Sequence, residues 1–178
     1  MAMRVFIPAL LLPTLLVGQT APARDSPTLG YRGFTLAVPY ADFLSRARAL
    51  AAPGTRAVVC NTSRRTAQLM ECGVSIIDPA DSAGLYLAAY VLEGRVGFLS
   101  FGDSGPAPLV TAVQRDLVTR FGSPHGSRIG MWEWRQARER VRLTWRSRGA
   151  ARWIYIALWD DGVMDRIAAY ARRTDPLK

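Results

Sequence analysis

The segment Gly84–Leu92 restricts the fold of this chain more than any other. Apolar residues alternate along it, so that Leu85 and its alternate neighbours fall on one side of an extended chain while Tyr86 and its alternate neighbours fall on the other. A strand that is apolar on both sides is typical of the centre of a sheet with two covered faces. Glu93-Gly94 follows directly and predicts a hairpin turn into a second strand.

Hydrophobic periodicity predicts the remaining elements. The helix over 108–121 has the strongest signals, since Pro108 suits a first helical position and Gly122 suits the residue after the last turn. Two further helices are expected over 40–51 and 162–173. Strands are expected over 31–38, 56–60, 66–71, 73–77, 84–92, 95–101, 130–135, 139–146 and 152–159.

The order of these elements is β-α-β-β-β-β-β-α-β-β-β-α. Because the strands come in blocks and do not alternate with helices, the pattern predicts an α+β fold. We expect a mostly antiparallel sheet of about eight strands with three helices, in a single domain.

The first 23 residues have the pattern of a secretory signal peptide. Arg4 precedes the apolar run Val5–Val17, which prolines interrupt and which is too short for a membrane span, and Ala21-Pro22-Ala23 suits a cleavage site. No cysteine follows the apolar run, so we do not expect a lipoprotein. The predicted division is a signal peptide over 1–23, a linker over 24–30, the α+β domain over 31–173 and a C-terminal tail over 174–178.

Export places the two cysteines, Cys60 and Cys72, in an oxidising compartment, where a disulfide is the favoured state. Of the 23 Lys and Arg residues only Lys178 is a lysine, a bias that suggests a GC-rich bacterial genome. We therefore expect a periplasmic or secreted bacterial protein, without a stable membrane span once the signal is removed.

Charge and aromatic residues concentrate in one stretch of the chain. All five tryptophans lie within 132–159, and eight arginines against two glutamates give a net charge of +6 over 128–152. Period two places Arg140, Arg142 and Arg146 on one side of a strand. Arginines beside aromatic rings suit anionic ligands, through paired guanidinium hydrogen bonds and stacking. The predicted binding residues are Arg140, Arg142, Arg146, Trp132 and Trp134. The simpler alternative is a solvated sheet face with its tryptophans packed inward.

A catalytic reading has weaker support. The segment Gly102–Pro106 resembles the nucleophile signature of serine proteases with one glycine missing, but the only histidine, His125, follows Ser104, whereas in that family it precedes the serine. Asp160 and Asp161 suit the start of a helix better than a calcium site. We therefore expect no catalytic residues, no metal and no cofactor.

The sequence as a whole predicts an exported, non-catalytic binding or structural protein of the bacterial cell envelope. Its expected partner is an anionic envelope component or an acidic protein surface, and export disfavours nucleic acid. Two alternatives stay open: a small secreted hydrolase that uses His125 with Ser104 or a nearby acid, and an inhibitory or scaffold domain without a ligand.

Overall fold

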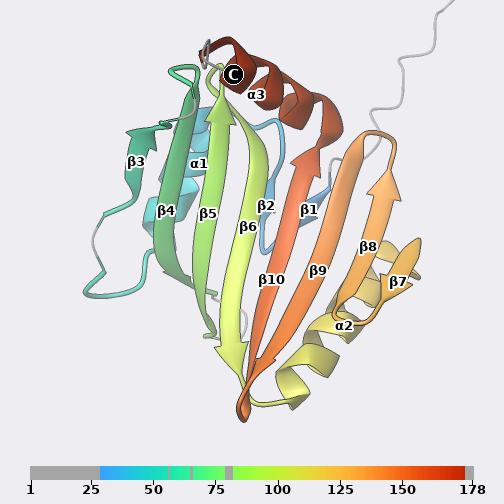
Figure 1. Ribbon diagram of the computed structural model, residues 1–178. Coiled ribbons are helices and arrows are strands. Elements are labelled where there is room, and N and C mark those ends of the chain that lie inside the picture. The colour runs from blue at the N-terminus through green and yellow to red at the C-terminus, as the bar shows by residue number, and fades with distance from the viewer. Residues whose placement is uncertain (1–28, 56, 65, 79–81, 175–178) are drawn as a thin grey trace, which may run out of the picture.

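One large antiparallel sheet organises the molecule (Figure 1). The structure, a computed structural model, describes residues 29–174 except 56, 65 and 79–81. The elements in chain order are β1 (Gly30–Tyr31), β2 (Phe34–Thr35), α1 (Tyr40–Ala49), β3 (Val59–Thr62), β4 (Leu69–Ile77), β5 (Gly84–Leu92), β6 (Arg95–Gly105), α2 (Pro108–Phe121), β7 (Gly126–Arg128), β8 (Met131–Gln136), β9 (Glu139–Arg148), β10 (Ala151–Asp160) and α3 (Asp161–Thr174).

The sheet is assembled from two meanders that meet at its centre. Its eight strands lie in the order β3-β4-β5-β6-β10-β9-β8-β7, and β1 pairs with β2 in a small separate sheet. Each meander follows a helix, because α1 precedes β3 to β6 and α2 precedes β7 to β10. The predicted α+β class, with an antiparallel sheet and three helices, is confirmed.

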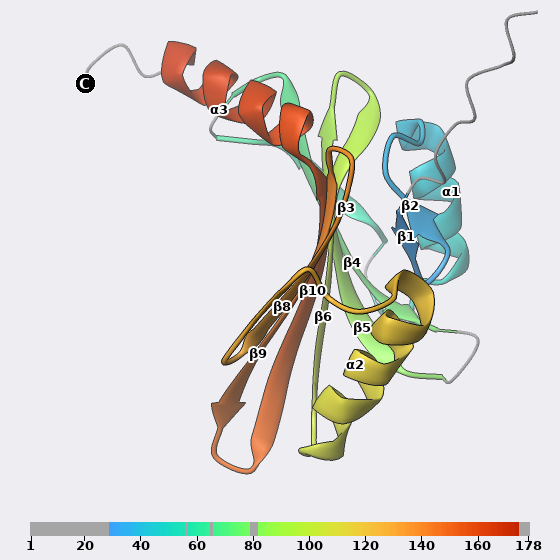
Figure 2. The ribbon, with the colours of Figure 1, turned by 90° about the vertical axis from the view of Figure 1, so that its right-hand side faces the viewer.

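The core lies on one face of the sheet. Figure 2 shows α1, α2 and the β1–β2 hairpin on this side. Phe43 of α1 and Leu117 of α2 are buried in the same cluster as Leu87, Phe101 and Ile156 of the central strands. This face is therefore the one that binds the helices to the sheet, and burial of its apolar side chains stabilises the fold.

The described residues give the opposite face little cover. Among the described elements only α3 lies on this side in Figure 2, at one end of the sheet, where Ile167 packs against Leu69 and Leu92. Asp160 begins this helix by accepting a hydrogen bond from the backbone N–H of Val163 at 2.9 Å, as its predicted capping role requires. The expectation that β5 is covered on both sides is therefore wrong away from α3, where Tyr86 is 56% exposed. We call this surface the open face.

Several predicted bounds are corrected. The strand expected over 31–38 is a hairpin of two short strands, because Arg32 and Gly33 both have positive φ (52° and 76°) and form the tight turn between them. The segments 66–71 and 73–77 belong to the single strand β4, and β6 continues to Gly105, beyond the expected end at 101. The short strand β7 was not predicted. The bounds of β5 and α2 are those that the sequence predicts.

The signal peptide predicted over 1–23, most of the linker, and residues 175–178 of the tail predicted over 174–178 lie outside the described residues, whereas Thr174 ends α3. Two residues assigned to the linker belong to the fold, since Leu29 is buried in the core and Gly30 begins β1. The backbone N–H of Leu29 donates a hydrogen bond to the Glu139 carboxylate at 2.6 Å, which ties the start of the domain to β9. None of the helices described here has the length and apolar character that a membrane span requires.

Candidate binding face

Strand register arranges the side chains of the open face in three parallel rows that cross the sheet. Residues directly opposite each other on neighbouring strands share a face, so the pairings define each row. The row nearest α3 contains Glu71, Tyr90, Phe98, Trp159, Arg140 and Arg135. The middle row contains Gly73, Ala88, Ser100, Ala157, Arg142, Glu133 and Gly126. The far row contains Ser75, Tyr86, Gly102, Tyr155, Thr144, Met131 and Arg128.

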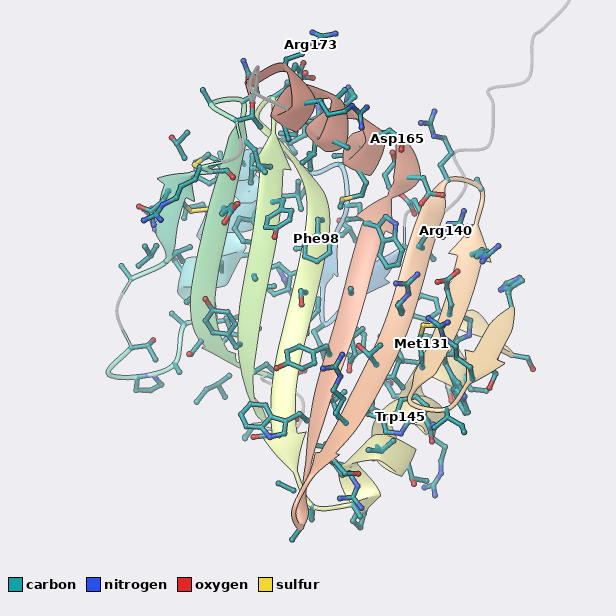
Figure 3. The ribbon with its side chains drawn as sticks, in the orientation of Figure 1. Phe98, Met131, Arg140, Trp145, Asp165 and Arg173 are labelled. Atoms are coloured by element: carbon teal, nitrogen blue, oxygen red, sulfur yellow. A yellow bond between two sulfur atoms is a disulfide. The ribbon has the colours of Figure 1, made fainter. Side chains whose placement is uncertain are left out.

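The middle row is a floor of small residues between aromatic ones. Ala88, Ser100 and Ala157 follow one another on the adjacent strands β5, β6 and β10. Tyr90 and Phe98 stack on the α3 side of this floor, with ring centroids 4.8 Å apart. Tyr86 and Tyr155 lie on its other side. Figure 3 shows Phe98 and Arg140 on the surface turned toward the viewer, away from α1 and α2.

Two glycines, Gly73 and Gly102, allow the rings of Tyr86 and Tyr155 to pack directly on the backbone of the sheet. A methyl group built on Gly73 would clash with the hydroxyl oxygen of Tyr86, so the ring of Tyr86 covers this glycine. The ring of Tyr155 lies over Gly102, with its Cε1 atom 3.5 Å from the place that a methyl group on that glycine would take. Tyr155 is 45% exposed. A ring that rests on the backbone with part of its surface in water offers a face on which a flat ligand can stack.

The aromatic rows lead into a cluster of arginines around one buried carboxylate. Glu133 is 5% exposed, and its Oε2 atom accepts hydrogen bonds from Nε and Nη2 of Arg142 at 3.0 and 2.6 Å. Its Oε1 atom accepts a hydrogen bond from Nε of Arg135 at 2.7 Å. Arg140 lies 3.6 Å from the same carboxylate and donates to Asp161 at 2.8 Å. The guanidinium of Arg142 also lies over the Trp159 ring, 4.9 Å from its centroid.

These contacts keep both carboxylates ionised. Burial alone would raise the pKa of Glu133, but the hydrogen bonds from Arg142 and Arg135 outweigh burial and hold the pKa below its ordinary value. The hydrogen bond from Arg140 likewise lowers the pKa of Asp161. Five arginines of this region (Arg128, Arg135, Arg140, Arg142 and Arg146) stand against these two carboxylates. These five arginines therefore exceed the two carboxylates by three positive charges.

A concavity of about 340 Å³ lies at the arginine end of the open face, lined by Gly126, Ser127, Arg128, Met131, Glu133, Arg135 and Arg142. Glu133 uses only part of the donors that surround it, since each guanidinium carries five N–H groups. At the other end of the face, a larger hollow of about 940 Å³ extends over β3 to β5 and includes Gly73, Tyr86, Ala88 and Tyr90.

The predicted site residues are not all brought together. Arg140, Arg142 and Arg146 share the open face, as period two predicts. Trp132 and Trp134 lie on the opposite side of the sheet, because the register pairs them with the core residues Leu143 and Val141. Trp134 is 2% exposed, and its indole N–H donates to the Gly122 carbonyl at 2.8 Å. The two tryptophans therefore do not stand beside the arginines.

Sequence reasoning missed the aromatic residues that do share this face. Trp153, Tyr155 and Trp159 of β10 lie on the open face, and Trp153 and Trp159 pair directly with Arg146 and Arg140 of β9. Period two groups these three residues on one side of their strand, but only the pairing with β9 shows which side that is. The apolar pattern of β5 predicts a covered face for Tyr86 and Tyr90, because the sequence does not show that α3 reaches only one end of the sheet.

The residues of the hydrolase alternative lie apart. Ser104 is the last residue but one of β6 and His125 precedes β7. The strands β10, β9 and β8 lie between β6 and β7, which separates these two strands by roughly 19 Å. The Nδ1 atom of His125 accepts a hydrogen bond from the backbone N–H of Arg135 at 3.3 Å. Nothing in this geometry forms a nucleophile–base pair.

Two further observations concern metals and covalent links. Across the part of the chain that the structure describes, no group of three His, Cys, Asp or Glu side chains could hold a metal ion. Cys60 and Cys72 stand directly opposite each other on β3 and β4 and form the predicted disulfide. The disulfide is compatible with an exported protein.

Comparisons of the chain with protein-family models, with curated proteins and with solved structures found no match in any of the three.

Proposed function

We propose that this chain is an exported, non-catalytic binding protein of the bacterial cell envelope, and that it takes an anionic partner on its open face. The observation that carries the proposal is the excess of three positive charges that five arginines of the open face hold over Glu133 and Asp161, next to exposed aromatic rings. Guanidinium groups bind carboxylates and phosphates through paired hydrogen bonds, and aromatic rings add contact area at little entropic cost.

Arg128 and Arg146 are the best positions at which to test the proposal. Both side chains are exposed, and neither makes a salt bridge within the described residues. Reversing the charge of Arg142 would instead place a second carboxylate beside the buried Glu133, which would destabilise the fold. Arg48 on α1 and Arg115 on α2 are also exposed, on the helices that cover the other face, and they provide a control of equal charge change.

The experiment is cosedimentation of the mature, oxidised protein with isolated bacterial envelope fragments. We expect the double variant Arg128→Glu/Arg146→Glu to bind at least roughly tenfold more weakly than the wild type, because it loses charge-assisted contacts. The control Arg48→Glu/Arg115→Glu should bind like the wild type. Equal loss in both variants would show a nonspecific charge effect and contradict the proposal, as would full binding by the open-face variant.

A further inference from the structure

We infer that the ligand of the open face is an acidic glycan, whose sugar rings lie across the strands and whose uronate carboxylate enters the arginine concavity. This inference rests on the proposed function and names the class of its ligand. The main support is the middle row, which connects the small-residue floor to the concavity without a break. Ala88, Ser100 and Ala157 of the floor are followed in this row by Arg142 and Glu133, which line the concavity.

The length and width of the floor suit an extended chain as ligand and not a folded domain. From β5 to β8 the middle row crosses four strand spacings, or about 19 Å. The two flanking rows stand two residues away along each strand on either side, and therefore about 13 Å from each other at the backbone. Aromatic side chains narrow this width on both sides. A floor of this width has room for a single ligand chain that lies across the strands.

The aromatic rings beside the floor suit sugar rings. One face of a pyranose ring presents C–H groups, while its hydroxyl groups point outward at the edge. The face of an aromatic ring carries negative charge density and attracts such C–H groups. Tyr86 and Tyr155 rest on Gly73 and Gly102 and remain half exposed, so their outer surfaces are available for this contact. Ser100, between them in the adjacent row, adds a hydroxyl that can bond to a sugar hydroxyl.

The distribution of charge favours an acidic glycan over a nucleic acid. In the three rows, β4, β5 and β6 contribute one charged residue, the acidic Glu71, and the arginines all come from β7, β8 and β9. A single-stranded nucleic acid carries a phosphate for every stacked base and is bound by cations that follow its backbone. A ligand with a neutral body and an acidic group at one end matches the observed arrangement.

The test is isothermal titration of the mature, oxidised protein with a cello-oligosaccharide that ends in a single glucuronate, with the neutral cello-oligosaccharide of the same length and with oligothymidylate. We expect the glucuronate-ended oligosaccharide to bind, and the neutral one to bind at least about tenfold more weakly, since it lacks the carboxylate. Tyr155→Ser should weaken the binding of the glucuronate-ended oligosaccharide, because it removes a ring, and Arg128→Gln should weaken it by removing a cation. The matched controls Val118→Ser and Arg115→Gln, on α2, should leave it unchanged.

Three results would overturn the inference: tighter binding of oligothymidylate than of the glucuronate-ended oligosaccharide, equal binding of the neutral and acidic oligosaccharides, or no binding of the glucuronate-ended oligosaccharide. Each of these leaves the proposed function standing if envelope binding still depends on Arg128 and Arg146. If envelope binding does not depend on these two arginines, the proposed function itself fails. The two failures are therefore distinguishable.

Discussion

The guanidinium of Arg142 binds the carboxylate of Glu133 on the solvent side of the sheet, with Nη2 and Oε2 2.6 Å apart. Glu133 is nearly inaccessible to solvent, although it stands on the face that the helices leave open. The side chains that cover it include the arginines that bind it. The basic surface of this protein is thus organised around an acid, which positions the cations and neutralises only part of their charge.

Glu133 makes stability depend on pH in the acid range. Its pKa in the folded protein is below that in the unfolded chain, so its contribution to folding is complete above the ordinary glutamate pKa of about 4.3. This contribution is lost as the pH falls through the lower folded value. We expect the free energy of unfolding to fall less steeply with acid in Glu133→Gln than in the wild type. Denaturant unfolding between neutral and acid pH measures both slopes, and equal slopes would contradict the assignment.

The disulfide between Cys60 and Cys72 should stabilise the fold by restricting the unfolded chain. The two cysteines are 12 residues apart in sequence, and a loop of this size corresponds to roughly 3 kcal/mol in the chain-entropy description. Cys60→Ala/Cys72→Ala should therefore lower the free energy of unfolding by about this amount. Reductant should destabilise the wild type and leave the double variant unaffected. A wild type that is indifferent to reductant would argue against this contribution.

The two sides of the sheet should respond differently to loss of a tryptophan. Trp134 fills the core and bonds to Gly122, so Trp134→Ala should lower the free energy of unfolding by about 3–5 kcal/mol. Trp153 is partly exposed on the open face, and Trp153→Ala should cost about 1 kcal/mol or less. Denaturant unfolding followed by circular dichroism compares the two. Similar costs would mean that the open face is covered in solution.

The sequence predicted the correct bounds for those elements in which the apolar pattern, the turn residues and the helix caps agreed. Gly84–Leu92 and Pro108–Phe121 have the expected bounds because turn residues and caps coincide with the ends of the apolar pattern. The hairpin at Arg32 was missed because its turn needs a positive φ at an arginine, a residue type that rarely adopts one. Such a conformation depends on contacts beyond the turn, which a local pattern does not contain.

The candidate site required strand register, which periodicity alone does not supply. Period two separated Arg140 and Arg142 correctly from Val141 and Leu143 within β9. It could not show that Trp132 stands opposite Leu143, and this pairing places Trp132 on the core side. A shift of register by one residue would exchange the two faces of a strand. The aromatic neighbours of the arginines could therefore be identified only from the assembled sheet.

The contact between Gly73 and Tyr86 predicts a specific coupling. The three atoms nearest to a methyl group built on Gly73, its chain neighbours aside, all belong to the Tyr86 side chain. In the background of Tyr86→Ser, Gly73→Ala should stabilise the protein by about 0.5–1 kcal/mol, because alanine costs less conformational entropy than glycine in a strand. With Tyr86 present, this gain should shrink or reverse, since the ring must move off the backbone. A double-mutant cycle of unfolding free energies measures the difference, and an additive cycle would mean that the ring does not rest on Gly73 in solution.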